Sequence, residues 1–261
     1  MAVIEQKSGP LNTLVRGYWE VEPCGTGAVL PGGVAKGSLE WYRQIEEHRY
    51  RAEPFIHGVA QFTRHRGKRL LEVGVGAGTD HLQWARAGLD CYGVDLTDAA
   101  IETTRKHLGH YGLSSNLQRI DAERLPFEDG FFDLVYSWGV IHHSESPEKI
   151  IAEIYRVLKP GGRFIGMMYG RRSPVVVKLW VRNALLRGRP WRSFREVVWN
   201  HMESIGTKAY TVRELKGLFQ RFSAVETLPL VTTYDRRGFP NAVSCFFPDE
   251  WGWFIGLRAV K

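Results

Sequence analysis

Three glycines and two acidic residues stand close together in the stretch LLEVGVGAGTD, which covers residues 70–80. Gly74, Gly76 and Gly78 follow an apolar run typical of a buried strand, and a helical pattern begins directly after them. A turn of this kind presents free backbone N–H groups and the positive end of a helix dipole to a ligand. The stretch therefore predicts a small-ligand site, and its neighbours must indicate which ligand.

The glycine spacing argues against two common nucleotide-binding loops. A phosphate-binding P-loop has the pattern G-x-x-x-x-G-K-[ST], and no lysine follows these glycines. In the dinucleotide fingerprint G-x-G-x-x-G the third glycine comes one residue later than it does here. Asp80 would also repel a pyrophosphate at the start of the helix. The glycines alone are weak grounds for choosing among the remaining ligands.

Acidic residues close to the ends of three predicted strands indicate which kind of ligand the site binds. Asp95 ends the second strand, where a carboxylate can accept hydrogen bonds from both hydroxyls of a ribose. Asp121 ends the third strand and is followed by Ala122, which places an acid where it can accept from an exocyclic amine. With Glu72 and Asp80 they form a ring of acids at the carboxyl edge of the sheet. Such a ring suits a ligand with positive charge, ribose hydroxyls and no phosphate, and it suits NAD poorly.

Strands and helices must alternate from Lys68 onward to position these residues. Helices of this length between strands mean crossover connections, and therefore a parallel sheet covered on both faces. Thr79 and Thr97 are the expected caps of the first two helices, and the turn KPGG is expected to end the third. Strands are predicted at 69–75, 90–95, 116–121, 132–138 and 163–169, helices at 79–88, 97–112 and 147–158.

The flanking regions follow other patterns. Residues 1–37 contain PCGTGAVLPGG and indicate a loop, whereas Ser38 is the expected cap of a helix that Pro54 restarts and Gly67 ends. Residues 171–208 indicate an irregular to helical insertion. Thr211 and Glu214 have the spacing of a capping box at the start of a later helix. Two late strands are predicted in SAVETLPLV (223–231) and in NAVSCFF…WGWFIGLRAVK (241–261).

The formal net charge of +7 comes from one window, residues 171–195. This window holds eight cations and no acid, so that +7 minus eight leaves −1 for the rest of the chain. A local basic patch is compatible with a solvated helical surface, nucleic acid, anionic lipid or an acidic substrate. Its cations are Arg171, Arg172, Lys178, Arg182, Arg187, Arg189, Arg192 and Arg195.

The motifs within residues 68–169 resemble, in unbroken order, those of class I S-adenosylmethionine-dependent methyltransferases. They are LLEVGVGAGTD, CYGVDLTDAAIE, IDAERLPFEDGFFDLVYSWGVIHH and EIYRVLKPGGRFI. The chain is most similar to the small-molecule group that includes quinone-biosynthesis enzymes. The resemblance implies S-adenosylmethionine as methyl donor and a Rossmann-like, seven-stranded, mostly parallel sheet with helices on both faces and an antiparallel last strand. We therefore expect an α/β fold with an N-terminal helical cap (1–67) and a methyltransferase domain (68–261) that carries a helical insertion after the fifth strand.

The resemblance also implies roles for individual residues. Asp95 would hold the ribose hydroxyls, and Leu96 would flank the adenine. Asp121 would meet the adenine amine, with the amide of Ala122 close by, and Ser137 would lie near the sulfonium. The full set of expected cofactor-binding residues is Glu72, Gly74, Gly76, Gly78, Asp80, Asp95, Leu96, Asp121, Ala122 and Ser137.

Candidates for handling the methyl acceptor are fewer. His142 and His143 follow the fourth strand at the expected mouth of the pocket, and histidine is the commonest general base near neutral pH. The sequence SWGVIHH replaces the Asn/Asp-Pro-Pro-aromatic motif of the family's nucleic-acid amino methyltransferases, so that we expect no nucleic-acid substrate. Expected substrate-binding residues are Tyr18, Trp19, Tyr42, Trp138, His201 and Tyr210.

We thus expect a methyltransferase that acts on an oxygen, nitrogen or carbon nucleophile of a small, hydrophobic molecule. Two alternatives stay open: an RNA methyltransferase drawn by the 171–195 patch, and a binding protein for S-adenosylmethionine without catalysis. The apolar residues of 171–195 do not form one clean helical face, so that at most loose membrane contact is expected there. Scattered cysteines exclude a cysteine zinc site, and a reducing, cytoplasmic location is expected.

Overall fold

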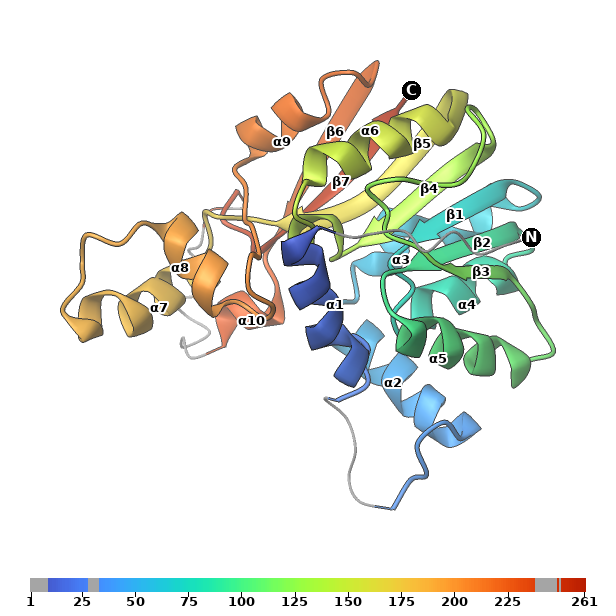
Figure 1. Ribbon diagram of the computed structural model, residues 1–261, viewed down its shortest axis with the longest axis horizontal. Helices are drawn as coiled ribbons and strands as arrows, with labels where there is room; N and C mark the ends of the chain where they lie inside the picture. Colours follow the sequence, from blue (N-terminus) through green and yellow to red (C-terminus); the bar gives the residue numbers. More distant parts are fainter. Residues whose placement is uncertain (1–8, 28–32, 238–247, 249) are drawn as a thin grey trace.

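The computed structural model describes residues 9–27, 33–237, 248 and 250–261, and a sheet forms its centre (Figure 1). The strands are β1 (Arg69–Val73), β2 (Asp90–Asp95), β3 (Asn116–Arg119), β4 (Phe132–Trp138), β5 (Leu158–Tyr169), β6 (Ala224–Leu230) and β7 (Phe254–Val260). They lie in the order β3-β2-β1-β4-β5-β7-β6. Pairings from β3 to β5 are parallel, and β7 is antiparallel to both β5 and β6. This confirms the predicted seven-stranded, mostly parallel sheet with an antiparallel last strand.

Helices cover the sheet and extend beyond it (Figure 1). Those within the predicted alternating region are α4 (Thr79–Arg86), α5 (Asp98–Gly109), η2 (Ile141–His143) and α6 (Pro147–Val157). Those before and after it are α1 (Pro10–Val21), α2 (Leu39–Ala52), α3 (Ile56–Ala60), η1 (Phe62–His65), α7 (Pro174–Asn183), η3 (Leu185–Arg187), α8 (Phe194–His201), α9 (Val212–Leu218) and α10 (Thr233–Arg236).

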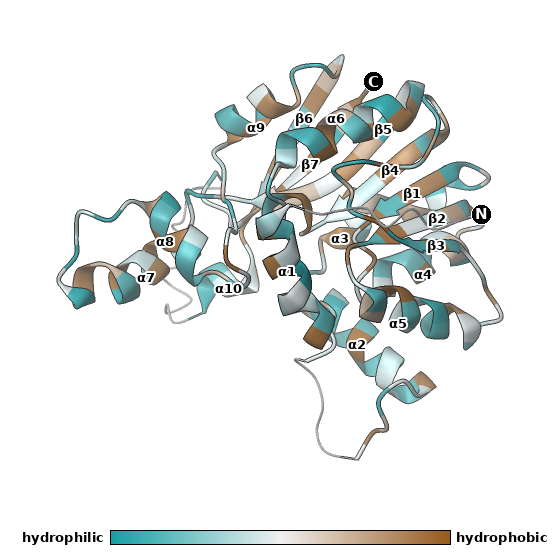
Figure 2. Ribbon diagram, viewed as in Figure 1, coloured by the Kyte–Doolittle hydropathy of each residue, from teal (hydrophilic) through white to brown (hydrophobic). Residues whose placement is uncertain are grey.

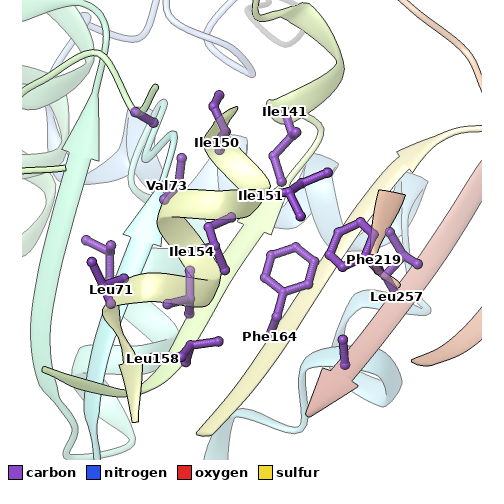
Figure 3. Packing of buried hydrophobic residues seen from close by; sticks show 14 of the residues in the cluster. Leu71, Val73, Ile141, Ile150, Ile151, Ile154, Leu158, Phe164, Phe219 and Leu257 are labelled. Atoms are coloured by element: carbon purple, nitrogen blue, oxygen red, sulfur yellow. The ribbon is translucent and has the colours of Figure 1, made fainter. Parts of the chain in front are cut away.

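Strand side chains alternate between two buried clusters, one on each face of the sheet. Along β1, Leu71 and Val73 join the cluster under α6 and α9, whereas Leu70 joins the cluster on the other face. This period of two follows from strand geometry and explains why the central strands are apolar on both faces (Figure 2). Figure 3 shows Ile150 and Ile154 of α6 packed on the first face.

The capping predictions hold with one exception. The Ser38 side chain accepts from the Trp41 N–H, and Thr97 accepts from the Ala100 N–H. The expected capping box at the start of α9 is also present. The prediction of Thr79 as a cap is wrong, because Gly78 occupies the N-cap position in the left-handed conformation and Thr79 is the first helical residue.

Two regions differ from the predicted pattern. Residues 1–37 are not all loop, since α1 covers residues 10–21; Pro10 at its first position and apolar residues at helical spacing are signals that predict it. The turn KPGG lies inside β5, where the register with β4 shifts between Phe132 and Leu134. Of the second late strand, the described part is β7, and NAVSCFF lies outside the described residues.

The expected insertion after β5 contains two helices, α7 and α8, which project from the body of the molecule as a lobe (Figure 1). The N-terminal region does not form a core of its own, because Ile56 and Phe62 share a buried cluster with Leu70 and Trp84. Among the described residues, no helix is long and apolar enough to cross a membrane.

Candidate functional site

The glycine loop between β1 and α4 requires glycine at all three positions. Gly74, Gly76 and Gly78 have φ angles of +83°, +52° and +75°, in the left-handed region that favours glycine. A Cβ on Gly74 would lie 2.2 Å from a methyl carbon of Val140, and one on Gly78 would lie 2.9 Å from Thr104. The loop is therefore held close to the start of η2 and to α5, with little room for larger residues.

Asp95 at the end of β2 connects that strand to the glycine loop. Its Oδ2 accepts from the Gly76 N–H at 3.2 Å, and its Oδ1 accepts from the N–H and hydroxyl of Thr97 at 3.0 and 2.8 Å. Burial raises the pKa of Asp95, although these hydrogen bonds act to lower it. The residue stays partly exposed, as does the adjacent Leu96, so that the strand end remains accessible beside the loop.

Asp121 is joined to α1, a contact that the sequence did not predict. The side-chain amide of Asn12 donates to Asp121 at 3.0 Å and to Glu123 at 2.7 Å. Its oxygen in turn accepts from the Glu145 N–H at 2.7 Å. Because Asn12 is 2% exposed, these bonds fix α1 at the carboxyl end of the strands.

The other end of α1 is held by α5. Glu20 accepts from the backbone N–H groups of Asp98 and Ala99. These groups lie in the first turn of α5 and therefore have no carbonyl partner within the helix. Trp19 lies edge-on against His143, with 5.6 Å between ring centroids. The helix therefore crosses in front of the predicted ligand site (Figure 1).

Glu72 lies at the carboxyl end of β1 but is fully enclosed. Its Oε2 is 2.9 Å from Nδ1 of His81, whose Nε2 is 2.8 Å from the Ser115 hydroxyl. Ser115 donates to the Cys91 carbonyl, so that its oxygen accepts from His81. Burial raises the pKa of Glu72 and lowers that of His81 to about 4, which favours a neutral acid donating to a neutral imidazole.

Asp80 is buried and paired. Arg49 of α2 donates to both carboxylate oxygens, at 2.9 and 2.6 Å, and the hydroxyls of Tyr50 and Tyr136 add bonds at 3.0 and 2.8 Å. Burial acts to raise the pKa of Asp80, but the charge and hydrogen bonds of Arg49 outweigh it and the pKa is lowered. Of the four acids expected to form a ring, Glu72 and Asp80 are thus bound to internal partners, whereas Asp95 stays partly exposed.

Ser137 and Ala122, two further predicted cofactor residues, are buried within the fold. The Ser137 hydroxyl is completely buried and donates to the Val73 carbonyl at 3.0 Å, tying β4 to β1. Ala122 is buried in the cluster under α6. Contact of these residues with a cofactor stays a prediction.

The two histidines after β4 differ from each other. Both are buried rather than at an open mouth, contrary to the expected placement. His142 packs against Tyr169, with 3.8 Å between ring centroids, and neither of its ring nitrogens has a hydrogen-bond partner among the described residues. Burial lowers its pKa well below the ordinary value. In His143, Nδ1 is 3.0 Å from both Ser204 and Thr207, and Nε2 is 3.3 Å from Glu203.

Glu203 was missed by the sequence analysis because nothing in HMESIG marks it. It is one of two non-glycine residues described with positive φ, at +48°, a strained conformation often found at functional sites. The Tyr169 hydroxyl lies 3.1 and 2.9 Å from its two oxygens. Burial acts to raise the pKa of Glu203, but His143 and Tyr169 outweigh it and the pKa is lowered.

Cys24 and Glu53 are further residues near this edge that the sequence did not indicate. The Cys24 carbonyl lies 3.4 Å from where a Gly76 Cβ would be, so that the N-terminal segment reaches the glycine loop. Although Cys24 is exposed as a residue, the atoms packed around it, followed by the charge of Glu203, raise the pKa of its thiol to about 12. Glu53 is buried and accepts from the Trp138 indole N–H at 2.9 Å. Trp138, a predicted substrate-binding residue, is itself buried.

The other predicted substrate residues are dispersed. Tyr42 is buried where α2 meets α5; there it stacks on His107 and donates to the Thr103 carbonyl. Tyr18 is half exposed on α1. His201 lies on α8 in the lobe, and Tyr210 packs against the cluster under α6 and α9. Of the six predicted substrate-binding residues, Trp19 alone has a ring contact with His143.

Known proteins resemble this chain in sequence and in fold. A protein-family profile described as "Methyltransferase domain" matches residues 71–166. A ubiquinone biosynthesis O-methyltransferase from Roseobacter denitrificans is 34% identical over 197 residues, covering 75% of this chain and 71% of that protein. The uncharacterized methyltransferase YcgJ of Bacillus subtilis is 35% identical over 110 residues, covering 41% of this chain and 44% of that protein.

A solved structure gives the same fold. The phosphoethanolamine N-methyltransferase 2 of Haemonchus contortus, in complex with phosphomonomethylethanolamine and S-adenosylhomocysteine, has a TM-score of 0.55 at 20% identity, covering 78% of this chain and 52% of that one. Several curated matches span less than half of the relative's own length, as with YcgJ. The Roseobacter match extends well beyond the motifs around the glycine loop. On the strength of that match, the chain belongs to the class I S-adenosylmethionine-dependent methyltransferase family.

Proposed function

We propose that this protein binds S-adenosylmethionine at the glycine loop and transfers its methyl group to a small molecule. When bound there, S-adenosylmethionine supplies a methyl group on a positively charged sulfur. The observation that carries the proposal is the hydrogen bond from the Gly76 N–H to Asp95, which holds this carboxylate against the glycine loop. The absence of a lysine after the glycines agrees with a ligand that has no phosphate.

The described residues fit such a ligand. Asp95 is partly exposed beside a loop whose glycines carry no side chains, and Asp121 is held by Asn12 at the next strand end. We assign the ribose hydroxyls to Asp95 and the adenine amine to Asp121. Asp80 acts indirectly, because its carboxylate is bound by Arg49 and fixes α2 against the start of α4.

The acceptor is proposed to be a small molecule, as expected from the sequence. The Roseobacter relative is named for ubiquinone biosynthesis, which supports an organic acceptor of limited size with apolar character. The placement of α1 in front of the strand ends also supports a small acceptor, since Asn12 and Glu20 hold that helix at both ends. Much of the rate enhancement then comes from holding the nucleophile aligned with the methyl group.

We assign proton handling to His143 and Glu203, and not to His142. Thr207 donates to the Ser204 carbonyl, so that the Thr207 oxygen accepts from Nδ1–H of His143. This leaves the lone pair of His143 Nε2 3.3 Å from the Glu203 carboxylate, so that one proton released by the acceptor is taken up and held between these two groups. His142 is enclosed without a partner and packs on Tyr169, which suits a packing role.

The test uses S-adenosylmethionine labelled on its methyl group, incubated with a small-molecule cell extract and separately with total RNA. We expect labelled organic-soluble product from the extract and none from RNA. His143→Asn, which keeps a donor toward Thr207, should lower the rate about 10²–10⁴-fold near neutral pH, whereas His142→Phe should lower it far less. Labelled RNA would favour the RNA methyltransferase. Cofactor binding without any labelled product would favour a binding protein without catalysis.

We further propose a cytoplasmic setting. Both described cysteines, Cys24 and Cys91, are free thiols, which agrees with a reducing compartment. Fractionation of cells that express the tagged chain tests this, and recovery outside the cytoplasm would contradict it.

A further inference from the structure

The end of the α7–α8 lobe carries large apolar side chains that face solvent. Leu185, Leu186 and Trp191 are 45%, 76% and 77% exposed, and all lie in the turn between the two helices. Phe194 at the start of α8 is exposed as well. Side chains of this size are usually buried, so that a cluster of them on a projecting turn indicates a binding surface. We call residues 182–191 the lobe tip.

The lobe tip is also positively charged. Arg182, Arg187 and Arg189 are exposed, and none of them forms a salt bridge within the described part of the chain. By contrast, Arg171 and Arg195 at the base of the lobe both bind Glu214, and Arg192 binds Glu196. The basic patch predicted for 171–195 is therefore neutralised in part at its base, whereas the three arginines at the tip are exposed and have no salt-bridge partner in the described chain.

The turn is ordered by its own hydrogen bonds. The N–H groups of Arg187 and Arg189 both donate to the Ala184 carbonyl, at 3.2 and 2.9 Å, and Gly188 ends the short η3 helix in the left-handed conformation. The Trp180 indole N–H donates to the Arg192 carbonyl at 2.7 Å and ties the turn back to α7. The exposed side chains are thus presented from a fixed backbone.

We propose that the lobe tip docks on a membrane surface that contains anionic lipid. Leucine and tryptophan side chains enter the boundary between headgroups and acyl chains, while arginines beside them bind anionic headgroups. A partly apolar tip suits a bilayer better than RNA, since the exposed Leu186 gains nothing from phosphates. No helix among the described residues can span a membrane, so that the contact is peripheral. The proposal does not depend on the methyl-transfer activity.

The experiment is flotation of the full chain with vesicles of phosphatidylcholine alone or mixed with phosphatidylglycerol. We expect flotation with the mixed vesicles, weakened by salt, and little with phosphatidylcholine alone. The double variant Leu186→Asp/Trp191→Asp should bind the mixed vesicles on the order of tenfold less or weaker. Arg187→Ser/Arg189→Ser should also weaken binding, by roughly fivefold per arginine.

Control variants change an exposed apolar side chain and two exposed arginines elsewhere in the chain. Val21→Asp alters an apolar residue that is 83% exposed at the end of α1, and Arg43→Ser/Arg64→Ser removes two exposed arginines far from the lobe in sequence; both should float like wild type. Circular dichroism checks that each variant is folded. No flotation of wild type, or equal loss in the controls, would overturn the proposal. Salt-sensitive RNA binding or concentration-dependent dimerisation lost in the tip variants, without vesicle binding, would overturn it in favour of those partners.

Discussion

The carboxyl edge of the sheet and the lobe tip both concentrate charge, but they treat it in opposite ways. At the sheet edge, Asp80 is buried and receives two bonds from Arg49, and Asp121 is held by Asn12. At the tip, Arg187 and Arg189 are exposed and without a salt bridge in the described chain. Charge at the first region is built into the fold, whereas charge at the second is available to a partner. The same kind of substitution should therefore have very different effects in the two regions.

The largest expected effect is on the Arg49–Asp80 pair. Asp80→Asn should lower the free energy of unfolding by about 3–5 kcal/mol, because it leaves the charge of Arg49 without its partner in a mostly buried position. The matched control is Asp90→Asn, whose pair with Arg69 is exposed and should be worth less than about 1 kcal/mol. Urea denaturation measures both. Equal losses of free energy of unfolding in the two variants would contradict the view that the buried pair stabilises the fold more than the exposed pair.

A smaller loss of free energy of unfolding is expected for a substitution in α1. Asn12→Ala should lower the free energy of unfolding by about 1–3 kcal/mol, since two carboxylates lose a buried donor. The control on the same helix is Thr13→Ala, whose exposed hydroxyl has the Gly9 carbonyl as its one hydrogen-bond partner among the described residues. Faster cleavage of α1 in limited proteolysis is expected only for the Asn12 variant. Unchanged stability and cleavage would mean that α1 is not fixed at the strand ends as described.

Glu214 pairs with Arg171 and Arg195 at the base of the lobe and should give a pH-dependent effect. Burial acts to raise its pKa, but hydrogen bonds from Arg171 and Thr211 outweigh this and hold the pKa at about 2. Because the folded-state pKa lies below the ordinary value of 4.5, the stabilisation is complete above pH 4.5 and is lost as the pH falls toward 2. As the side chain is partly exposed, we expect about 1 kcal/mol. Denaturation curves at pH 6 and pH 3 should differ less for Glu214→Gln than for wild type.

The smallest effect is expected from removing charge at the lobe tip. Arg187→Ser/Arg189→Ser should change the free energy of unfolding by no more than about 0.5 kcal/mol, because neither side chain has a salt-bridge partner in the described chain. Thermal unfolding with and without salt measures it. A loss as large as that of Asp80→Asn would show that these arginines are part of the fold.

The strands and helices of residues 68–169 could be predicted because their signals are local: apolar runs typical of buried strands, helical spacing between them, and the cap at Thr97. The positions of Asp95 and Asp121 at strand ends followed from the same patterns. The partners of these acids did not, since Asn12 lies 109 residues from Asp121 and Arg49 lies 31 residues from Asp80. Contacts between distant segments leave no periodic mark in the sequence. Glu203 was invisible for that reason, as its bonds to Tyr169 and His143 exist only after folding.

The central claim is that the glycine loop and Asp95 hold S-adenosylmethionine. Isothermal titration calorimetry with S-adenosylhomocysteine and with NAD tests it on wild type, Asp95→Ala and the control Asp90→Ala at the other end of β2. We expect wild type to bind S-adenosylhomocysteine and not NAD, Asp95→Ala to lose about 1–3 kcal/mol of binding free energy, and Asp90→Ala to match wild type. Binding of NAD without S-adenosylhomocysteine, or an unchanged affinity in Asp95→Ala, would contradict the claim.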